Sequence, residues 1–419
     1  TIANTEGDLA RVASILSEQM AGANSQYQAL QNYNIQTSDY NNHWVGLYSN
    51  TMENAKIIMD TYQAKDPHYA GIAQVLMAIN LGIATDLWGD VPYSKAFGGA
   101  SGVFIAPYDT QQSVIVSIQG LLDAGIANMA KPASANIDIP GGDDLYYSGD
   151  LTKWTKAAWT LKARYANRVS KKDPASAANV LAYLAKGITD PADNMENIHP
   201  ASGNSQNQWG AFEKQRTGYF VANKIFVDAL KSNNDPRLSY YFNPDAHNAY
   251  TGADITALVV DPNASTIGTT VTAGTTTGSY FDVARNYPLV TSYEASFLSA
   301  EAKVRLGQDA SADLNAGIKG SVAYVTQGTN SGASIATYTP ATANLTNVMT
   351  EKWKAMFGQI EAYNDWRRTG IPALIVRPGS AGAVLNYIPV RLPTPDIEHL
   401  GNPNAVFYAL NVPVWWASN

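Results

Sequence analysis

The chain has 419 residues, of which 45% are hydrophobic and 15% charged, so it is long enough and apolar enough to bury a large core. It carries 28 Lys and Arg against 35 Asp and Glu, and the net charge of −7 includes no basic run, which argues against nucleic acid as a partner. The sequence has no cysteine, which excludes disulfides, thiol catalysis and cysteine-ligated zinc.

The first strong helical signals form a hairpin. Apolar residues recur at spacings of three and four over 44–58 and again over 69–87. Asp66 is a candidate N-cap with Pro67 at the first helical position, and Gly89 ends the second helix. Because the link between the helices is short, they are expected to pack antiparallel.

Further helices follow along the chain. Asp109, Asp150 and Asp173 each precede an apolar periodic stretch, and Thr291 with Glu294 forms a capping box. Helices that cannot bury their apolar faces alone are typical of stacked repeats. The sequence therefore predicts a mainly α fold, a helical-repeat scaffold with about four tetratricopeptide-like pairs, placed at about 44–88, 109–170, 174–231 and 292–326.

Other stretches interrupt this pattern. Residues 89–108 and 243–288 are rich in Gly, Thr, Asn and Pro, and long loops on a rigid scaffold often carry function. The C-terminal part, 345–419, begins with a helix to Trp366 and is then expected to be irregular cover. The composition includes 24 Tyr and 9 Trp, which suits the stacking of sugars or peptides but also serves as core.

The sequence contains no phosphate loop, nucleophile elbow or zincin motif. Two acidic pairs, Asp143 with Asp144 and Glu361 with Asp365, are compatible with a glycosidase or a calcium site. They are equally explained as loop groups and as ion-pair partners of Arg367 or Arg368. We expect no catalytic residue, no cofactor and no metal.

Several motifs carry a family resemblance. The segment 84–96, ATDLWGDVPYSKA, resembles the signature of the SusD-like (SusD/RagB) family of cell-surface nutrient-binding lipoproteins. In the same order follow YSGDLTKW at 147–154, NDPRL at 234–238, a long match over 353–372 and IPVRL at 388–392. The resemblance covers nearly the whole chain from about residue 40.

The resemblance implies one SusD-like domain over residues 1–419, without catalysis. It implies a protein on the extracellular face of the outer membrane of a Gram-negative bacterium, held by an N-terminal lipid anchor that is absent from this chain. Its partner would be a SusC-like TonB-dependent outer-membrane transporter, to which it delivers captured oligosaccharides. A peptide-binding RagB-like uptake protein is the runner-up, and an α/α-type glycoside hydrolase is the alternative from another class.

The resemblance also directs the search for a ligand site to loops, here about 24–44, 190–215 and 243–288. Tyr40 is expected to stack on the ligand, and Asn41 and Asn42 to bind hydroxyls. Trp209, whose neighbours in sequence are polar, and Tyr280, at the end of the long Thr-rich loop, are the further ligand-binding candidates. The tryptophans of the signature motifs are expected to be scaffold.

Overall fold

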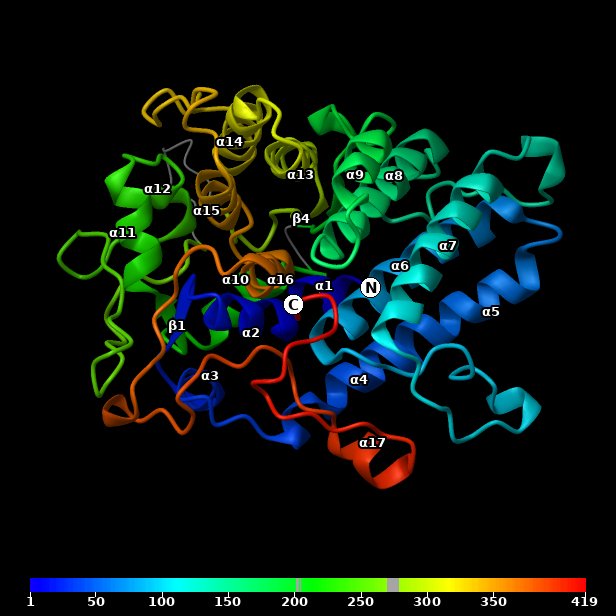
Figure 1. The fold of residues 1–419 in the computed structure, drawn as a ribbon, viewed down its shortest axis with the longest axis horizontal. Helices are drawn as coiled ribbons and strands as arrows, with labels where there is room; N and C mark the ends of the chain where they lie inside the picture. The colour runs from blue at the N-terminus through cyan, green and yellow to red at the C-terminus, as the bar shows by residue number, and fades with distance from the viewer. Residues whose placement is uncertain (201–202, 204, 270–278) are drawn as a thin grey trace. The chain divides into compact units, whose positions relative to one another are not determined.

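The computed structural model describes residues 1–200, 203, 205–269 and 279–419. The fold is mainly helical, as the sequence predicts (Figure 1). Parts of the predicted loops 190–215 and 243–288 fall on residues 201, 202, 204 and 270–278, and these parts lie outside the described residues.

The chain divides into two compact units, where the sequence predicts one domain. Unit 1 comprises Thr1–Thr5, Ile35–Met195 and Pro389–Asn419, and unit 2 comprises Glu6–Asn34 and Glu196–Ile388. Neither unit is continuous in sequence. The boundary between the units is therefore not marked by a single linker in the sequence.

Unit 1 contains the predicted helical hairpin. A helical run of α4, a π-helical turn and α5 packs against α6, and α6 packs against α7. Next, α8 packs against both α7 and α9. The bounds are α4 Asn41–Leu47, the turn Tyr48–Met52, α5 Glu53–Tyr62, α6 Pro67–Trp88, α7 Gln111–Met129, α8 Leu151–Arg168, α9 Ser176–Leu184 and α17 Asp396–Gly401.

The segment 174–231, predicted as one helix pair, is divided between the two units. Helix α9 packs against α8, and the segment that follows it contains two short strands and α10 before α11 begins. Helix α9 belongs to unit 1 and α11 to unit 2. Apolar periodicity identifies helices but not the partner each helix buries its face against.

Helix α6 is the most apolar element. It is long and apolar enough to cross a membrane, but 89% of its most apolar window is buried within the fold. Such burial is typical of a core helix. Pro67 occupies its first turn, as predicted, while the carboxylate of Asp66 makes no capping hydrogen bond. Asp66 instead accepts hydrogen bonds from a loop described below.

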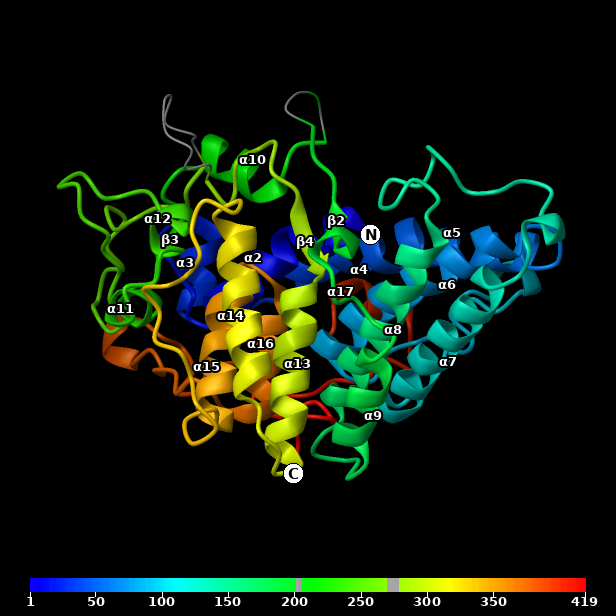
Figure 2. The same ribbon diagram turned by 90° about the horizontal axis from the view of Figure 1, so that it is seen from above.

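The short helix α1, Ile2–Glu6, lies where the chain passes from unit 1 to unit 2, and unit 2 contains the other α-helices. Helices α13 and α14 lie side by side, with α15 against both (Figure 2). The bounds are α2 Asp8–Leu16, α3 Ser25–Gln31, α10 Gln208–Gln215, α11 Lys224–Ser232, α12 Leu238–Tyr241, α13 Ser292–Arg305, α14 Ser311–Val325, α15 Leu345–Ala355 and α16 Ile360–Thr369. The predicted cap of α13 is confirmed, because the Thr291 hydroxyl accepts from the Glu294 amide at 3.2 Å.

Strands are few and short. They are β1 Met20–Gly22, β2 Met195–Asn197, β3 Phe220–Ala222 and β4 Tyr287–Val290. In unit 2, β1 pairs antiparallel with β3, with Ala21 opposite Val221. The helix expected over 345–366 is two helices, because the chain turns at Gly358 with a φ of +78°. A side chain there would also meet Phe281, 2.6 Å from the Cβ position.

Candidate ligand-binding site

Three predicted site residues lie together where α4 begins. Tyr40 is only 2% exposed, and its ring meets the edge of Trp88 with centroids 6.0 Å apart. The side-chain oxygen of Asn41 accepts from the Ile397 amide at 3.2 Å, whereas Asn42 is exposed. Of the three, Asn42 is the side chain that solvent and a ligand can reach freely.

The other two predicted residues are buried in unit 2. Trp209 is 0% exposed and stacks on Phe281 with centroids 4.6 Å apart, and Tyr280 is 2% exposed and meets the same ring at 4.7 Å. The expectation that these rings are free to stack on a ligand is therefore not supported. The polar sequence neighbours of Trp209 do not indicate its exposure, because its apolar partners Phe220 and Phe281 come from elsewhere in the chain.

Exposed aromatic groups occur instead on the loop after α6. Phe104 is 84% exposed, and its neighbours Val103 and Ile105 are 36% and 50% exposed. On the same loop, Phe97 is half-buried. We call Tyr48, Tyr93, Phe97 and Phe104 the aromatic platform.

The base of the platform consists of ring contacts. Phe97 stacks on Tyr48 with centroids 6.3 Å apart, and Tyr93 meets the edge of Phe97 at 6.4 Å. Tyr48 in turn packs against Trp44 at 4.6 Å. The loop thus stands on the helical run of α4 and the π-helical turn, and Phe104 lies at its exposed tip.

Asp109 fixes the two ends of this loop. Its carboxylate accepts hydrogen bonds from the amides of Tyr93 and Ser94 at 2.8 and 2.7 Å. The sequence predicts Asp109 as a helix cap, but the cap of α7 is Thr110, whose hydroxyl accepts from the Ser113 amide. Nearer the tip, the Val103 amide donates to the Gly98 carbonyl at 3.0 Å, so the loop is closed on itself.

A single carboxylate anchors the groups beneath the platform. Glu398 accepts from the indole of Trp44 and the hydroxyl of Tyr108, both at 3.1 Å. Burial, with the nearby Glu398 charge, raises the pKa of Tyr108. Burial also raises the pKa of Tyr48 well above its ordinary value. Both hydroxyls therefore stay neutral at physiological pH, and can donate or accept hydrogen bonds.

The acidic pairs are structural. In unit 2, Asp365 pairs with Arg368 and Lys352, at 2.7 Å in each case. In unit 1, Asp144 accepts from the Trp154 indole at 2.7 Å. Asp150 caps α8, as predicted. No group of three His, Cys, Asp or Glu in the described part of the chain is placed to hold a metal ion.

Of the signature tryptophans, Trp88 and Trp154 are buried, whereas Trp366 is half-buried. Trp88 donates its indole hydrogen to the Pro393 carbonyl at 2.8 Å and is 4% exposed, and Trp154 is fully buried. The loops that the family resemblance indicates, 24–44, 190–215 and 243–288, do not contain the residues of the platform. Phe104, flanked by Val103 and Ile105 within a Gly-rich loop already identified in the sequence, is the signal that could have found it.

Comparisons with known proteins give a consistent result. A family model described as SusD-like_2, starch-binding associating with outer membrane, matches residues 2–395. No curated protein matches the chain in sequence.

Solved structures share the fold over nearly the full length. A SusD/RagB family protein from Bacteroides thetaiotaomicron is 25% identical, with a TM-score of 0.81 over 98% of this chain and 95% of that one. A chitin-binding SusD homologue from Flavobacterium johnsoniae is 23% identical, with a TM-score of 0.81 over 97% and 93%. A SusD homologue from Bacteroides uniformis is 21% identical, with a TM-score of 0.78 over 100% and 97%.

Proposed function

The chain belongs to the SusD-like family, and we propose that it is a non-catalytic cell-surface protein that binds oligosaccharides at the aromatic platform. The observation that carries the proposal is the exposed apolar run of Val103, Phe104 and Ile105 on a loop held by hydrogen bonds. A contiguous exposed apolar surface, unlike a single exposed residue, marks an interaction site, and loops on a rigid scaffold often carry such sites. The family description and the chitin-binding homologue support a carbohydrate as the ligand.

Stacking of a sugar ring explains the arrangement of the platform. The C–H face of a sugar is apolar and flat, and an aromatic ring covers it with little loss of conformational entropy because it has only two side-chain torsions. Hydroxyls at the edge of the sugar need hydrogen-bond partners, which the exposed Asn42 and Ser94 offer. We propose fragments of chitin and starch as the first ligands to test, with peptides as the runner-up.

We further propose delivery to a SusC-like TonB-dependent transporter on the extracellular face of the outer membrane. A lipid anchor at the N-terminus of the mature protein would keep the binding site close to the transporter. Tethering raises the effective concentration of captured ligand at the transporter entrance, which a freely diffusing protein would not do. Purification of the lipidated protein from native membranes in mild detergent should recover a TonB-dependent barrel, and recovery of the protein alone would contradict the partnership.

Binding without catalysis is tested by two measurements on one sample. The protein is run through gels that contain chitin or starch fragments, and the same polysaccharides are incubated with it and analysed for released products. We expect retarded migration in at least one gel and no released sugar. Release of sugar that disappears in Asp365→Asn would instead favour the glycosidase.

A further inference from the structure

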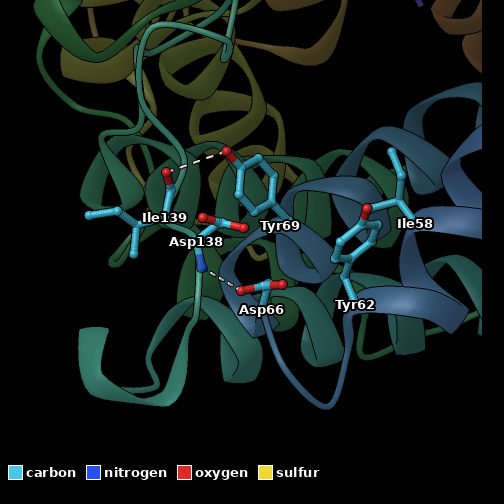
Figure 3. Close-up of a pocket in the computed structure, with 6 residues that line it drawn as sticks. All are labelled: Ile58, Tyr62, Asp66, Tyr69, Asp138 and Ile139. Carbon is cyan, nitrogen blue, oxygen red and sulfur yellow. Dashed lines mark hydrogen bonds between the residues drawn. The ribbon is translucent and has the colours of Figure 1, made fainter.

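A second site lies in unit 1 apart from the platform. A cavity of about 430 Å3 opens beside the turn of the helical hairpin. It is lined by the end of α5, the start of α6 and the loop that precedes α8, through Ile58, Tyr62, Asp66, Tyr69, Asp138 and Ile139 (Figure 3). Cavities of this size accommodate a monosaccharide or an amino-acid side chain.

Asp66 is held in this cavity by the opposing loop. Its Oδ1 accepts from the amides of Ile137 and Asp138, at 2.8 and 2.7 Å. Asp66 is 1% exposed, and its second oxygen, Oδ2, has no hydrogen bond to any residue that the structure describes. Because Oδ2 lines the cavity and is not among the fully buried oxygens without a partner, it can accept from a donor that enters the cavity from outside the chain.

Asp138 adds a second carboxylate to the same space. Figure 3 shows its side chain directed toward the space between Tyr69 and Asp66. Within the described residues, no Lys or Arg forms an ion pair with either carboxylate. The positive end of α6 offsets about half of one charge and the Lys65 ammonium over Tyr62 a further one, so the three carboxylates of Asp66, Asp138 and Asp143 leave the region net negative.

The negative charges around the cavity affect the pKa of Tyr69. Its hydroxyl donates to Asp143 at 2.7 Å, and that hydrogen bond, with the charges of Asp143, Asp138 and Asp66, raises the pKa of Tyr69 to about 12. The same hydroxyl hydrogen is shared with the Ile139 carbonyl, whose oxygen lies 3.3 Å away. Tyr69 thus joins α6 to the loop that contains Ile139 and Asp143.

Tyr62 supplies an aromatic face that already attracts a cation. The ammonium of Lys65 lies 4.7 Å from the centroid of this ring. Carboxylates near an aromatic face form the combination that stabilises an organic cation, through charge-assisted hydrogen bonds and the ring quadrupole. A calcium ion, by contrast, needs six to eight oxygen ligands, more than two carboxylates supply.

We propose that this cavity binds a primary ammonium group on a ligand, carried either by an amino sugar such as glucosamine or by a lysine side chain. Asp66 Oδ2 and Asp138 accept its hydrogens, Tyr62 covers one side, and Ile58 and Ile139 contact the carbon body. The site goes beyond the proposed glycan-binding function. Tyr48 and Tyr62 lie 14 residues apart on one helical run, or roughly 20 Å.

The test uses matched pairs of probes that differ in one charge. Glucosamine is compared with N-acetylglucosamine, and Nα-acetyl-lysine amide with its Nε-acetylated form, by isothermal titration at pH 6. We expect the free amine of at least one pair to bind about tenfold or more tightly than its acetylated partner. Binding of glucosamine alone identifies an amino sugar, and binding of the lysine derivative alone identifies a peptide side chain.

Three variants separate this site from a general charge effect. Asp138→Asn removes one carboxylate from an exposed position, and should weaken amine binding about tenfold while neutral glycans still bind at the platform. Asp60→Asn is the control, since it makes the same charge change on α5 at an exposed residue outside the cavity, paired with Lys56. Tyr62→Leu should weaken binding less than Asp138→Asn.

Three results would overturn the proposal. The first is equal affinity of the protein for the acetylated and the free amines. The second is equal affinity of Asp138→Asn and Asp60→Asn for the free amine. The third is that the protein binds calcium but neither amine, and that Asp138→Asn abolishes calcium binding. Because neutral glycans are titrated on the same samples, failure of this site and failure of the platform give different results.

Discussion

Two aromatic regions of this protein differ in what their rings face. In unit 2, Trp209, Tyr280 and Phe281 cover one another, and their exposed fractions lie between 0 and 2%. In unit 1, the rings of Tyr48, Tyr93 and Phe97 support a loop whose Phe104 is 84% exposed. Both regions come from segments with many polar or small residues, so composition does not distinguish them.

The difference shows that a ligand site depends on what the aromatic rings leave uncovered. A ring that is already stacked on both sides contributes to folding, and a ligand would have to displace its neighbours. A ring on a hydrogen-bonded loop is held in place while its face stays available. Truncation of a ring in the buried region of unit 2 should therefore lower stability, whereas truncation of Phe104 in unit 1 should lower ligand affinity.

Truncation of the buried region should have the largest effect. Trp209→Ala removes a fully buried side chain that stacks on Phe281, and the cavity left behind should lower the free energy of unfolding by about 3–5 kcal/mol. Urea denaturation measures this change. In conditions where the variant remains folded, its glycan affinity should equal that of the wild type. A stable variant with weakened glycan binding would return Trp209 to the ligand site.

A buried acid next to this region should make stability depend on pH. Glu213 lies on α10 with Trp209 and is 3% exposed, and burial raises its pKa to about 7. The folded state therefore holds a proton that the unfolded chain releases near pH 4.5. The contribution of Glu213 to stability should fall as pH rises from about 4.5 to about 7, by on the order of 3 kcal/mol. Glu18 in unit 2, whose pKa burial raises to about 8, should add a further fall that continues to about pH 8.

Glu213→Gln should reduce this slope between pH 4.5 and 7 and leave the part that Glu18 contributes, and thermal unfolding measured at pH 4.5, 6 and 7.5 tests it. The platform offers the contrast, because Phe104→Ala should leave both the slope and the stability within about 0.5 kcal/mol of the wild type. An unchanged slope in Glu213→Gln would assign the pH dependence to another group.

The smallest effect concerns the predicted residue that the structure leaves exposed. If Asn42 binds a ligand hydroxyl, Asn42→Ala should weaken glycan binding by about 0.5–1.5 kcal/mol without changing stability. Asn50→Ala, a change of an exposed amide on the same helical run, serves as the control. Equal titration curves for the two variants would remove Asn42 from the site.

The sequence predicts the helices more successfully than the site. Apolar periodicity and local caps such as Thr291 and Asp150 depend on neighbouring residues, and these predictions are confirmed. The burial of Trp209 depends on Phe281, far away in the chain, which periodicity does not report. Asp66 shows the same limit, since it serves a distant loop instead of its own helix, and Asp109 joins the ends of its own loop instead of capping α7.

The most direct test of the account is the titration of the wild type and Phe104→Ala with the oligosaccharide that gels identify. Leu258→Ala, a change at another exposed apolar residue, is the control because Leu258 is 73% exposed in unit 2. We expect Phe104→Ala to lose about 1–3 kcal/mol of binding free energy, by analogy with stacking on nucleobases, while the control binds as the wild type does. Equal affinities for all three proteins would contradict the proposal that the platform is the ligand site.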